Sequence, residues 1–368
     1  NITLLVTLIV WSWVLKNGPV AVTELLLIDG YTCFFSALMI VTTLACCTIA
    51  HTYLREFPDN REELYLLLLL SLIGALVLVS SSHFASLFVG LEMLSVPLYG
   101  LVAYHRRRSR SLEAGIKYLV LSATGSALLL LGIAFLYAQT GTMSLPAMGQ
   151  QLASQGENLS YMALAGVTLI LIALGFKLSL VPFHLWTPDV CEGAPAPAGA
   201  FLATVAKIAV AAVLLRLIAW FPLIASSALQ NVLVLLAGLS MLAGNLLALH
   251  QTNLKRLLAY SSISHFGYLL TGLAAINYVS LQSSMIYLFT YTFATLAAFG
   301  VLSVVSVTHK VEGEDADGLQ HYRGLFWKQP YLAAIMLVSM LSLAGMPMTI
   351  GFIGKFYVIL AAINSSLW

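Results

Sequence analysis

Four ionisable side chains lie in the middle of long apolar runs. They are Glu92 in LFVGLEMLSVPLYG, Lys177 in IALGFKLSLVPFHLW, Lys207 in FLATVAKIAVAAVL and Lys355 in GFIGKFYVIL. An ionisable side chain at the centre of a membrane helix costs about 2.5–3.5 kcal/mol on insertion scales, so we expect these groups to face protein or water. One carboxylate cannot neutralise three lysines, and desolvation favours a lysine that has lost its proton. The pattern therefore favours a series of proton carriers over static ion pairs that hold helices together.

Two further polar residues extend this candidate series. His265 lies in SSISHFGYLL, well inside another apolar run, and Lys117 lies in EAGIKYLVLS. Lys117 is only about one and a half helical turns from the start of its run. A single histidine inside a membrane helix is more often a packed hydrogen-bonding residue than a carrier, so His265 is the weaker candidate.

Three prolines predict interruptions in the same apolar runs. Pro97, Pro182 and Pro347 each remove a backbone hydrogen bond from a helix. A plain proline kink explains any one of them, but Pro182 follows Lys177 by five residues and Pro347 precedes Lys355 by eight. Non-helical backbone at membrane depth has to be buried in protein or to line a cavity, and ion sites of transporters are built from broken helices in two halves. We therefore expect two broken helices beside the proton path.

The composition defines the kind of structure that positions these residues. Of the 368 residues, 60% are apolar and only 9% are charged, with a mean hydropathy of +0.94. An ordinary soluble domain carries about 25% charged residues. This excludes a cytosolic enzyme and a disordered protein, and the net charge of +2 leaves no basic face for nucleic acid. The chain is predicted to be an all-α polytopic membrane protein with a single membrane domain over residues 1–368.

Eleven apolar segments are long enough to cross a bilayer, for which about 20 residues are needed. The last segment is long enough for a broken helix, and the connections between segments are short. The predicted spans are 1–16, 30–53, 63–80, 83–104, 112–139, 160–187, 198–219, 229–250, 255–275, 279–308 and 331–364. The chain begins at Asn1 without a basic leader region, which predicts no signal peptide, and it stops in an apolar run, which suggests a fragment of a longer protein of about fourteen helices.

Lysine and arginine in the loops predict the orientation of the spans. The loops near 80–83, 140–159, 220–228 and 275–279 contain neither residue. Because basic loops stay on the cytoplasmic side, the HRRRSR loop is placed there. Lys16 is the exception on the uncharged side, and Arg216, near a helix end, is expected to extend to the interface. The basic loop residues are Arg55, Arg61, Arg106, Arg107, Arg108, Arg110, Lys255, Arg256, Lys310, Arg323 and Lys328.

The spans divide into two halves of similar plan. Five helices run over approximately 63–219, with the helix of Lys177 fourth, and in the incomplete half over 229–368 the helix of Lys355 is again fourth. A repeat with an odd number of helices enters the membrane from the opposite side in its second copy. We therefore predict two inverted five-helix repeats with broken helices.

The chain carries no motif for a cofactor of its own. It contains no Walker A loop, no GxGxxG after a strand and no CxxCH, and the four cysteines lack metal-ligand spacing. No histidine pair is spaced for a b-type haem. The sequence predicts neither a redox centre nor a metal site, and no disulfide framework.

Four segments together resemble a known family. The runs GFKLSLVPFHLWTPDVCEGAPAP, TNLKRLLAYSSISHFGYLL, LFVGLEMLSVPLYG and MLSLAGMPMTIGFIGKFYV are similar to those of the antiporter-like membrane subunits of respiratory complex I, an NADH:quinone oxidoreductase. The WTPDV–EGAPAP run most resembles the subunit N branch. The resemblance covers the chain from residue 29 onward and implies an antiporter-like fold. One departure is Cys191, where the family pattern suggests tyrosine.

The resemblance also implies roles for the candidate residues. Glu92 matches the glutamate that pairs with the lysine of a broken helix, here Lys177. Lys207 matches the connecting lysine, and Lys355 the lysine at the boundary of the unit, where the subunit M branch has glutamate. Lys117 and His265 match polar positions on the same axis. The implied relay therefore consists of Glu92, Lys177, Lys207, Lys355, Lys117 and His265.

The implied function is proton translocation across a bacterial inner membrane, coupled to NADH oxidation and quinone reduction in other subunits. Opening or closing of the Glu92–Lys177 pair would drive a proton through Lys207 and His265 toward Lys355. The complex as a whole would use NADH, FMN, iron–sulfur clusters and quinone, none of them in this chain. The implied partners are the neighbouring subunit M, the small subunits K, J and A, and lipids. Two alternatives remain: a cation/proton antiporter subunit of the Mrp type, and a purely structural membrane subunit.

Overall fold

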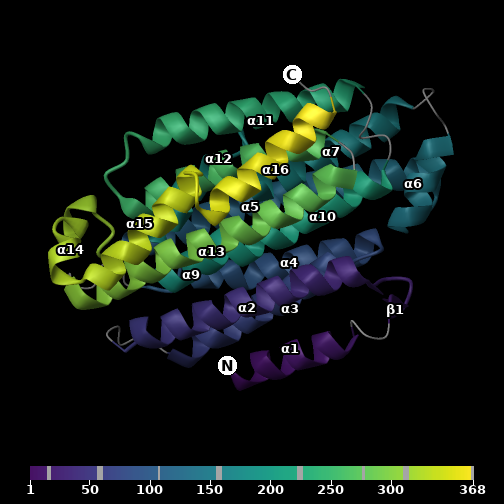
Figure 1. Ribbon diagram of the computed structural model, residues 1–368. Helices are drawn as coiled ribbons and strands as arrows, with labels where there is room; N and C mark the ends of the chain where they lie inside the picture. The colour runs from purple at the N-terminus through teal and green to yellow at the C-terminus, as the bar shows by residue number, and fades with distance from the viewer. Residues whose placement is uncertain are drawn as a thin grey trace.

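The computed structural model describes residues 1–14, 18–55, 61–106, 108–154, 160–221, 227–275, 278–309 and 315–365. Lys16, Arg107 and Lys310 of the predicted loop pattern lie outside these residues. Nearly all described elements are helices that run side by side along one axis, with α1 (Ile2–Val14) and α11 (Ser227–Ala248) at opposite edges of the bundle (Figure 1). One short antiparallel pair, β1 (Val20–Ala21) and β2 (Leu27–Ile28), lies in the connection after α1.

The predicted spans are confirmed as helices. Eight of the described helices are long and apolar enough to cross a membrane. The other predicted spans correspond to α1, to α12, which is more polar, and to the two shorter helices α15 and α16. Besides α1 and α11 the main helices are α2 (Gly30–Tyr53), α3 (Arg61–Ser80), α4 (Phe84–Val102), α5 (Ser109–Thr140), α7 (Tyr161–Leu178), α10 (Lys207–Trp220), α12 (Leu254–Ala274), α13 (Tyr278–His309), α15 (Pro330–Ala344) and α16 (Ile350–Asn364).

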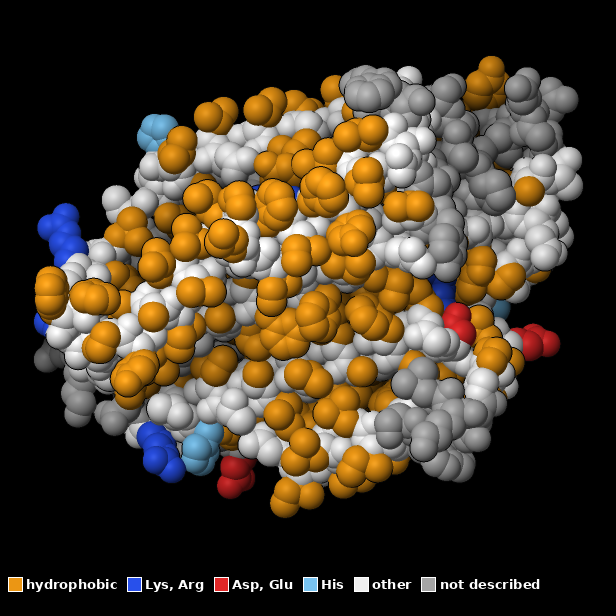
Figure 2. Space-filling model, in the orientation of Figure 1, with side chains coloured by type: hydrophobic (Ala, Val, Ile, Leu, Met, Phe, Trp, Pro, Cys, Tyr) orange, Lys and Arg blue, Asp and Glu red, His pale blue; other side chains and the backbone are white. Residues whose placement is uncertain are grey.

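Short elements join these helices. They are α6 (Leu145–Ser154), α8 (Trp186–Gly193), α9 (Ala196–Phe201), the π-helix η2 (Leu202–Ala206), the 3-10 helix η4 (Leu319–Tyr322) and α14 (Leu325–Lys328). The face of the bundle shown in Figure 2 is covered mainly by apolar side chains, and most of its charged side chains lie toward the two ends. Many of the largest exposed side chains are leucine, isoleucine, valine and phenylalanine, as a lipid-facing surface requires.

Both predicted helix breaks are present. α7 ends at Leu178, Ser179 adopts the left-handed conformation with φ 66°, and a turn containing the cis Val181–Pro182 bond leads to α8. The second break separates α15 from α16, where Gly345 has φ 79° and closes the end of α15. Pro97 behaves differently, because it lies within α4 and the helix continues through it.

A central helix runs through the middle of the bundle. α9, η2 and α10 follow one another without a gap from Ala196 to Trp220, and the apolar window of this segment is 100% buried inside the bundle. Lys207 is the first residue of α10, directly after the π-helical turn. Such a turn often marks a functional position, because it alters the direction of the side chains that follow it.

The basic loops meet at one end of the bundle. Tyr53, at the end of α2, contacts His105 in the α4–α5 loop and Asp315 after α13. Asp315 in turn forms a buried ion pair with Lys255 at the start of α12. At the other end, His83 forms a β-bridge with Ser144, and Leu26 with Ser81. The contacts therefore place together the loops that the charge pattern assigned to the cytoplasmic side.

The prediction for Arg216 was wrong. Its side chain does not extend to the interface but is 7% exposed, and its guanidinium binds both carboxylate oxygens of Asp29 at 2.6 Å. It also donates to the carbonyl of Val79 at 2.9 Å and lies over the rings of Tyr31 and Trp220. The sequence could not reveal this contact, because it joins residues 187 positions apart. Arg216 therefore ties α10 to the start of α2 and the end of α3.

We expect Arg216→Met to lower the stability of the subunit by roughly 1–3 kcal/mol, because charge-assisted hydrogen bonds are lost and the Val79 carbonyl is left without its donor. The measurement is the thermal unfolding midpoint of the purified assembly. Arg106→Met is the matched control, since its 3.6 Å ion pair with Glu63 is exposed and surface pairs contribute little. Equal midpoints for the two variants would contradict this assignment.

Candidate functional site

Glu92 and Lys177 face the same region but make no direct ion pair, although both belong to the described part of the chain. The Ser126 hydroxyl donates to Glu92 Oε1 at 2.5 Å. Lys177 Nζ donates to Ser95 Oγ at 2.8 Å and to Ser122 Oγ at 2.5 Å. Serine hydroxyls of α4 and α5 are therefore the hydrogen-bond partners of Glu92 and Lys177, where a direct ion pair was expected. The expected pair is thus replaced by a serine-lined arrangement in which the two charges lie apart.

Lys207 lies fully inside the bundle. Its side chain is 2% exposed, its Nζ donates to Ser262 Oγ on α12 at 2.6 Å, and it lies 5.1 Å from the centre of the Phe266 ring. No carboxylate forms an ion pair with Lys207 within the described ranges. A buried lysine that is held by a hydroxyl is able to exchange its proton without first breaking an ion pair.

A small cavity connects Lys177 with Lys207. Both lysines line it, together with Ser95, Tyr118 and Trp186. Its volume is about 10 Å³, which is close to the minimum for one water molecule. Water-mediated hydrogen bonds are nearly as favourable as direct ones. One water at this position would complete a path between the two lysines.

His265 and Lys355 both lie near the ring of Tyr268. His265 is buried on α12, three residues after Ser262, and its Nδ1 contacts the Tyr287 hydroxyl at 2.6 Å. Its ring centre is 6.5 Å from that of Tyr268, and Lys355 Nζ is 4.7 Å from the same ring. Hydroxyl and imidazole groups of α12 and α13 therefore fill the space between the central helix and the second break.

Lys355 binds the carbonyl groups that the second break leaves free. Its Nζ donates to Leu343 O at 2.9 Å and to Ala344 O at 3.1 Å, both in the last turn of α15. The C-terminus of a helix attracts a positive charge, because its carbonyl dipoles point there. Backbone carbonyls, rather than a carboxylate, therefore accept the hydrogen bonds of the Lys355 side chain.

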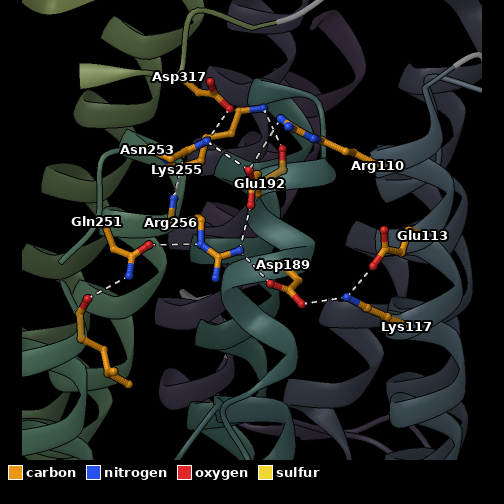
Figure 3. Close-up of polar contacts among 11 residues, drawn as sticks. Arg110, Glu113, Lys117, Asp189, Glu192, Gln251, Asn253, Lys255, Arg256 and Asp317 are labelled. Atoms are coloured by element: carbon orange, nitrogen blue, oxygen red, sulfur yellow. Dashed lines mark hydrogen bonds and ion pairs between the residues drawn. The ribbon is translucent and has the colours of Figure 1, made fainter. Parts of the chain in front are cut away.

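Lys117 occupies a different environment from the other candidates. Its side chain is 42% exposed and forms ion pairs with Glu113 at 2.6 Å and Asp189 at 2.9 Å. Figure 3 shows it at one side of an ionic network between α5, α8 and α12. The structure therefore places Lys117 at the end of the bundle, away from the buried series, because it lies early in α5.

The network contains residues that the sequence reasoning missed. Arg256 Nη1 binds Asp189 at 2.7 Å and Glu192 at 2.8 Å, and Asn253 Nδ2 binds Asp317 at 2.7 Å (Figure 3). The available signal was the spacing of Asp189 and Glu192, which places both acids on one side of a short helix. From the sequence, Arg256 was expected only to lie in a loop on the cytoplasmic side.

Asp315 and Lys255 form the buried part of this end. Lys255 Nζ also donates to Ala194 O at 2.7 Å, and the Tyr53 hydroxyl donates to Asp315 Oδ1 at 2.6 Å. Burial alone raises the pKa of Asp315, but the Lys255 ammonium and the Tyr53 hydroxyl lower it by more, so the pKa stays below its ordinary value. Asp315 therefore remains charged at neutral pH, and the contacts of Lys255 with Asp315 and Ala194 fix the loop after α8.

No group of three or more histidine, cysteine or acidic side chains within the described ranges is arranged to hold a metal ion. What the described site offers is hydroxyls, lysines and one histidine along a buried path. The fold and site define the class: a multi-pass helical membrane protein with two broken helices and buried lysines in its interior.

The comparisons with known proteins agree with this class. The model of the NADH:quinone oxidoreductase/Mrp antiporter transmembrane family matches residues 81–368, and the chain belongs to this family. It is 56% identical over 356 residues to NADH-quinone oxidoreductase subunit N of Ectopseudomonas mendocina, which covers 95% of this chain and 71% of that protein.

Solved structures share the fold. A chain of respiratory complex I from Thermus thermophilus with bound aureothin matches with a TM-score of 0.83 and 36% identity, over 99% of this chain and 76% of that one. A chain of an archaeal membrane-bound sulfane sulfur reductase matches with a TM-score of 0.85 and 23% identity, over 98% and 75%. A chain of the Mrp complex from a Dietzia species matches with a TM-score of 0.83 and 23% identity, over 99% and 68%. The last two likenesses support the fold only.

Proposed function

We propose that this chain translocates protons as the antiporter-like subunit N of an NADH:quinone oxidoreductase, respiratory complex I, in a bacterial inner membrane. The observation that carries the proposal is the buried path from Lys177 through the shared cavity to Lys207 and Ser262. The 56% identical relative bears the name of this subunit. The chain is a part of the translocase, and NADH oxidation and quinone reduction belong to other subunits.

The candidate residues receive distinct roles in this proposal. Lys177 and Lys207 exchange a proton across the cavity, and Glu92 sets the charge state of Lys177 from a distance. Ser262, His265 and the tyrosines around it lead from Lys207 toward Lys355. Lys117 serves as part of the ionic end of the bundle.

The fold supports a proposal for how the path is built. α3 to α10 and α11 to α16 would form two repeats of opposite orientation, each with one broken helix, α7–α8 and α15–α16. In this arrangement each break would lie beside one lysine, with Lys177 before the first break and Lys355 after the second. The central helix with Lys207 would connect the two.

The partners are other membrane subunits of complex I. We propose that the neighbouring subunit M and the small subunits K, J and A are among them, and that the FMN, iron–sulfur clusters and quinone of the complex bind elsewhere. An Mrp-type antiporter subunit is the second candidate function. The identity to the Mrp chain is 23%, against 36% for the complex I chain, which favours complex I.

The test uses inside-out membrane vesicles in which NADH oxidation drives proton uptake, followed with a pH-gradient dye. Lys207→Met is expected to slow proton uptake by at least about tenfold, because a positioned proton-transfer group contributes roughly 10²–10⁴-fold to its step. The assembled complex should persist, since methionine fits the same volume. Lys328→Met is the matched control, because Lys328 lies exposed at the end of α14.

Wild-type proton uptake by assembled Lys207→Met complexes would contradict the proposed role of Lys207. Purification of the tagged chain distinguishes the two candidate functions. Co-purification with an NADH-oxidising, quinone-reducing assembly supports complex I. Recovery in an assembly that exchanges cations for protons without NADH would support the Mrp-type alternative.

A further inference from the structure

The helix that follows the first break is held from both sides by charged contacts. Asp189 on α8 binds Lys117 of α5 at 2.9 Å and Arg256 of α12 at 2.7 Å. Glu192, one turn further along α8, binds Arg256 at 2.8 Å and lies 3.9 Å from Arg110. Figure 3 shows α8 between these two helices, and each of its two acids contacts a residue of both. The network therefore joins α5 and α12 across α8.

A buried aromatic stack of side chains from α5, α7 and α8 lies beside this network. Trp186, three residues before Asp189, stacks on Tyr118, which follows Lys117, with ring centres 4.9 Å apart and planes at 15°. Trp186 also stacks on Phe176 at 5.5 Å, and its indole N–H donates to the Phe176 carbonyl at 3.1 Å. Both Tyr118 and Trp186 are buried. The stack therefore separates the exposed ionic network from the interior.

The inner side of this stack faces the proton path. Tyr118 and Trp186 line the small cavity that Lys177 and Lys207 share. The outer side is within one turn of Lys117 and Asp189, which water reaches. α8 thus stands between bulk water at the charged end and the two buried lysines.

Non-helical residues flank α8 at both ends. It is preceded by the seven residues of the first break, from Ser179 to Leu185, and followed by Ala194 and Pro195 before α9 begins. Helix boundaries of this kind are where hinge rotation occurs. Asp189 is poorly suited to carry protons itself, because a carboxylate bound by two cations resists protonation. Its contacts are suited to holding α8 in place.

We propose that α8 is a closure at the charged end of the subunit, in which Asp189 and Arg256 are positioning residues that keep the Tyr118–Trp186 stack shut over the Lys177–Lys207 cavity. Breaking the contacts of Asp189 admits water to the cavity from that end. The proposal rests on the proposed function, because a proton path needs a closure. A path that was open to both sides of the membrane at once would leak protons. The closure itself is testable without any measurement of pumping.

The native thiols of the chain provide the test. Cys191 lies buried on α8, two residues after Asp189, so it reports water access to the buried side of this helix. Cys46 is fully buried in α2 and reports general loosening. Two full-length versions of the subunit are prepared in the assembled complex, one retaining only Cys191 and the other only Cys46, with every other cysteine of the subunit replaced by alanine. Inside-out vesicles are treated with a charged methanethiosulfonate, and the label is read on the isolated subunit.

Asp189→Asn is expected to increase the labelling rate of Cys191 by about tenfold, the order expected when charge-assisted hydrogen bonds that hold a closed state are lost. Arg256→Gln should act in the same direction, since it removes the other partner. Arg106→Gln is the matched control at the same end, because its partner Glu63 lies outside the network. In all variants Cys46 should stay unlabelled.

Two results would overturn the closure. The first is an unchanged labelling rate of Cys191 in both Asp189→Asn and Arg256→Gln. The second is a parallel rise for Cys46, which would mean that the bundle has loosened as a whole. Either result leaves the proposed proton translocation standing, whereas faster labelling of Cys191 alone supports the closure even if pumping by this chain were disproved.

Discussion

Lys355→Arg is expected to assemble normally and to slow NADH-driven proton uptake by at least about tenfold, a lower bound on what a positioned proton-transfer group contributes. Arginine keeps the positive charge and supplies donors for the carbonyls of Leu343 and Ala344. It cannot lose its proton in a protein. The variant therefore preserves the electrostatic role of Lys355 and removes only its capacity to release a proton.

The measurement compares proton uptake with quinone reduction in the same vesicles. Lys328→Arg, at the exposed end of α14, is the matched control and should behave as the wild type. Lys355→Met provides the opposite case, because it removes both the charge and the proton. If Lys355→Arg pumps at the wild-type rate while Lys355→Met does not, Lys355 is an electrostatic anchor of the second break, and the last proton site lies elsewhere.

Glu92→Gln is expected to reduce proton uptake by about tenfold while the complex assembles, because its carboxylate acts on Lys177 through charge rather than through contact. Glutamine can keep the hydrogen bond from the Ser126 hydroxyl, which measures 2.5 Å in the native chain. Ser126→Ala is the informative control, since it removes that hydrogen bond and keeps the charge. We expect only a small effect from Ser126→Ala on the same assay.

The two variants separate two explanations. A severe defect in Ser126→Ala together with normal pumping by Glu92→Gln would show that the hydroxyl, and not the charge, matters at this position. A defect confined to Glu92→Gln supports long-range action on Lys177. Assembly is checked in each case by the amount of subunit that co-purifies with the NADH-oxidising activity.

The elements of the fold were predictable from local sequence. Apolar length located the spans, and Pro182 and Pro347 located both breaks, because proline removes a backbone hydrogen-bond donor from a helix. Pro97 shows the limit of this reasoning, since α4 absorbs its proline without a break. Whether a proline breaks a helix depends on what satisfies the freed carbonyl, and that is decided by neighbouring helices.

The contacts of the site were less predictable than its members. Lys177 and Lys207 were identified from the cost of burying a charge, but their serine partners on α4, α5 and α12 were not. Serine is common in membrane helices, and only the rotation of each helix about its axis decides which hydroxyl reaches a lysine. The same holds for Arg216 and Asp29, which are far apart in sequence and meet only after packing. Lys117 was expected about one and a half turns into its helix, but its ion pairs with Glu113 and Asp189 were not.

The complete enclosure of the central helix has a consequence for biosynthesis. The segment Ala196–Trp220 carries Lys207 and Arg216, and each would cost about 2.5–3.5 kcal/mol in direct contact with lipid. Its neighbours come from both sides in the chain: α2 and α3 are made before it, and α13 is made after it. During translation the helix therefore leaves the insertion machinery with one flank already sheltered by older helices and the other still uncovered. The subunit can reach its final packing only after α13 has been inserted, so a ribosome-bound intermediate that ends before α13 should depend most strongly on a chaperone or on the insertase for protection.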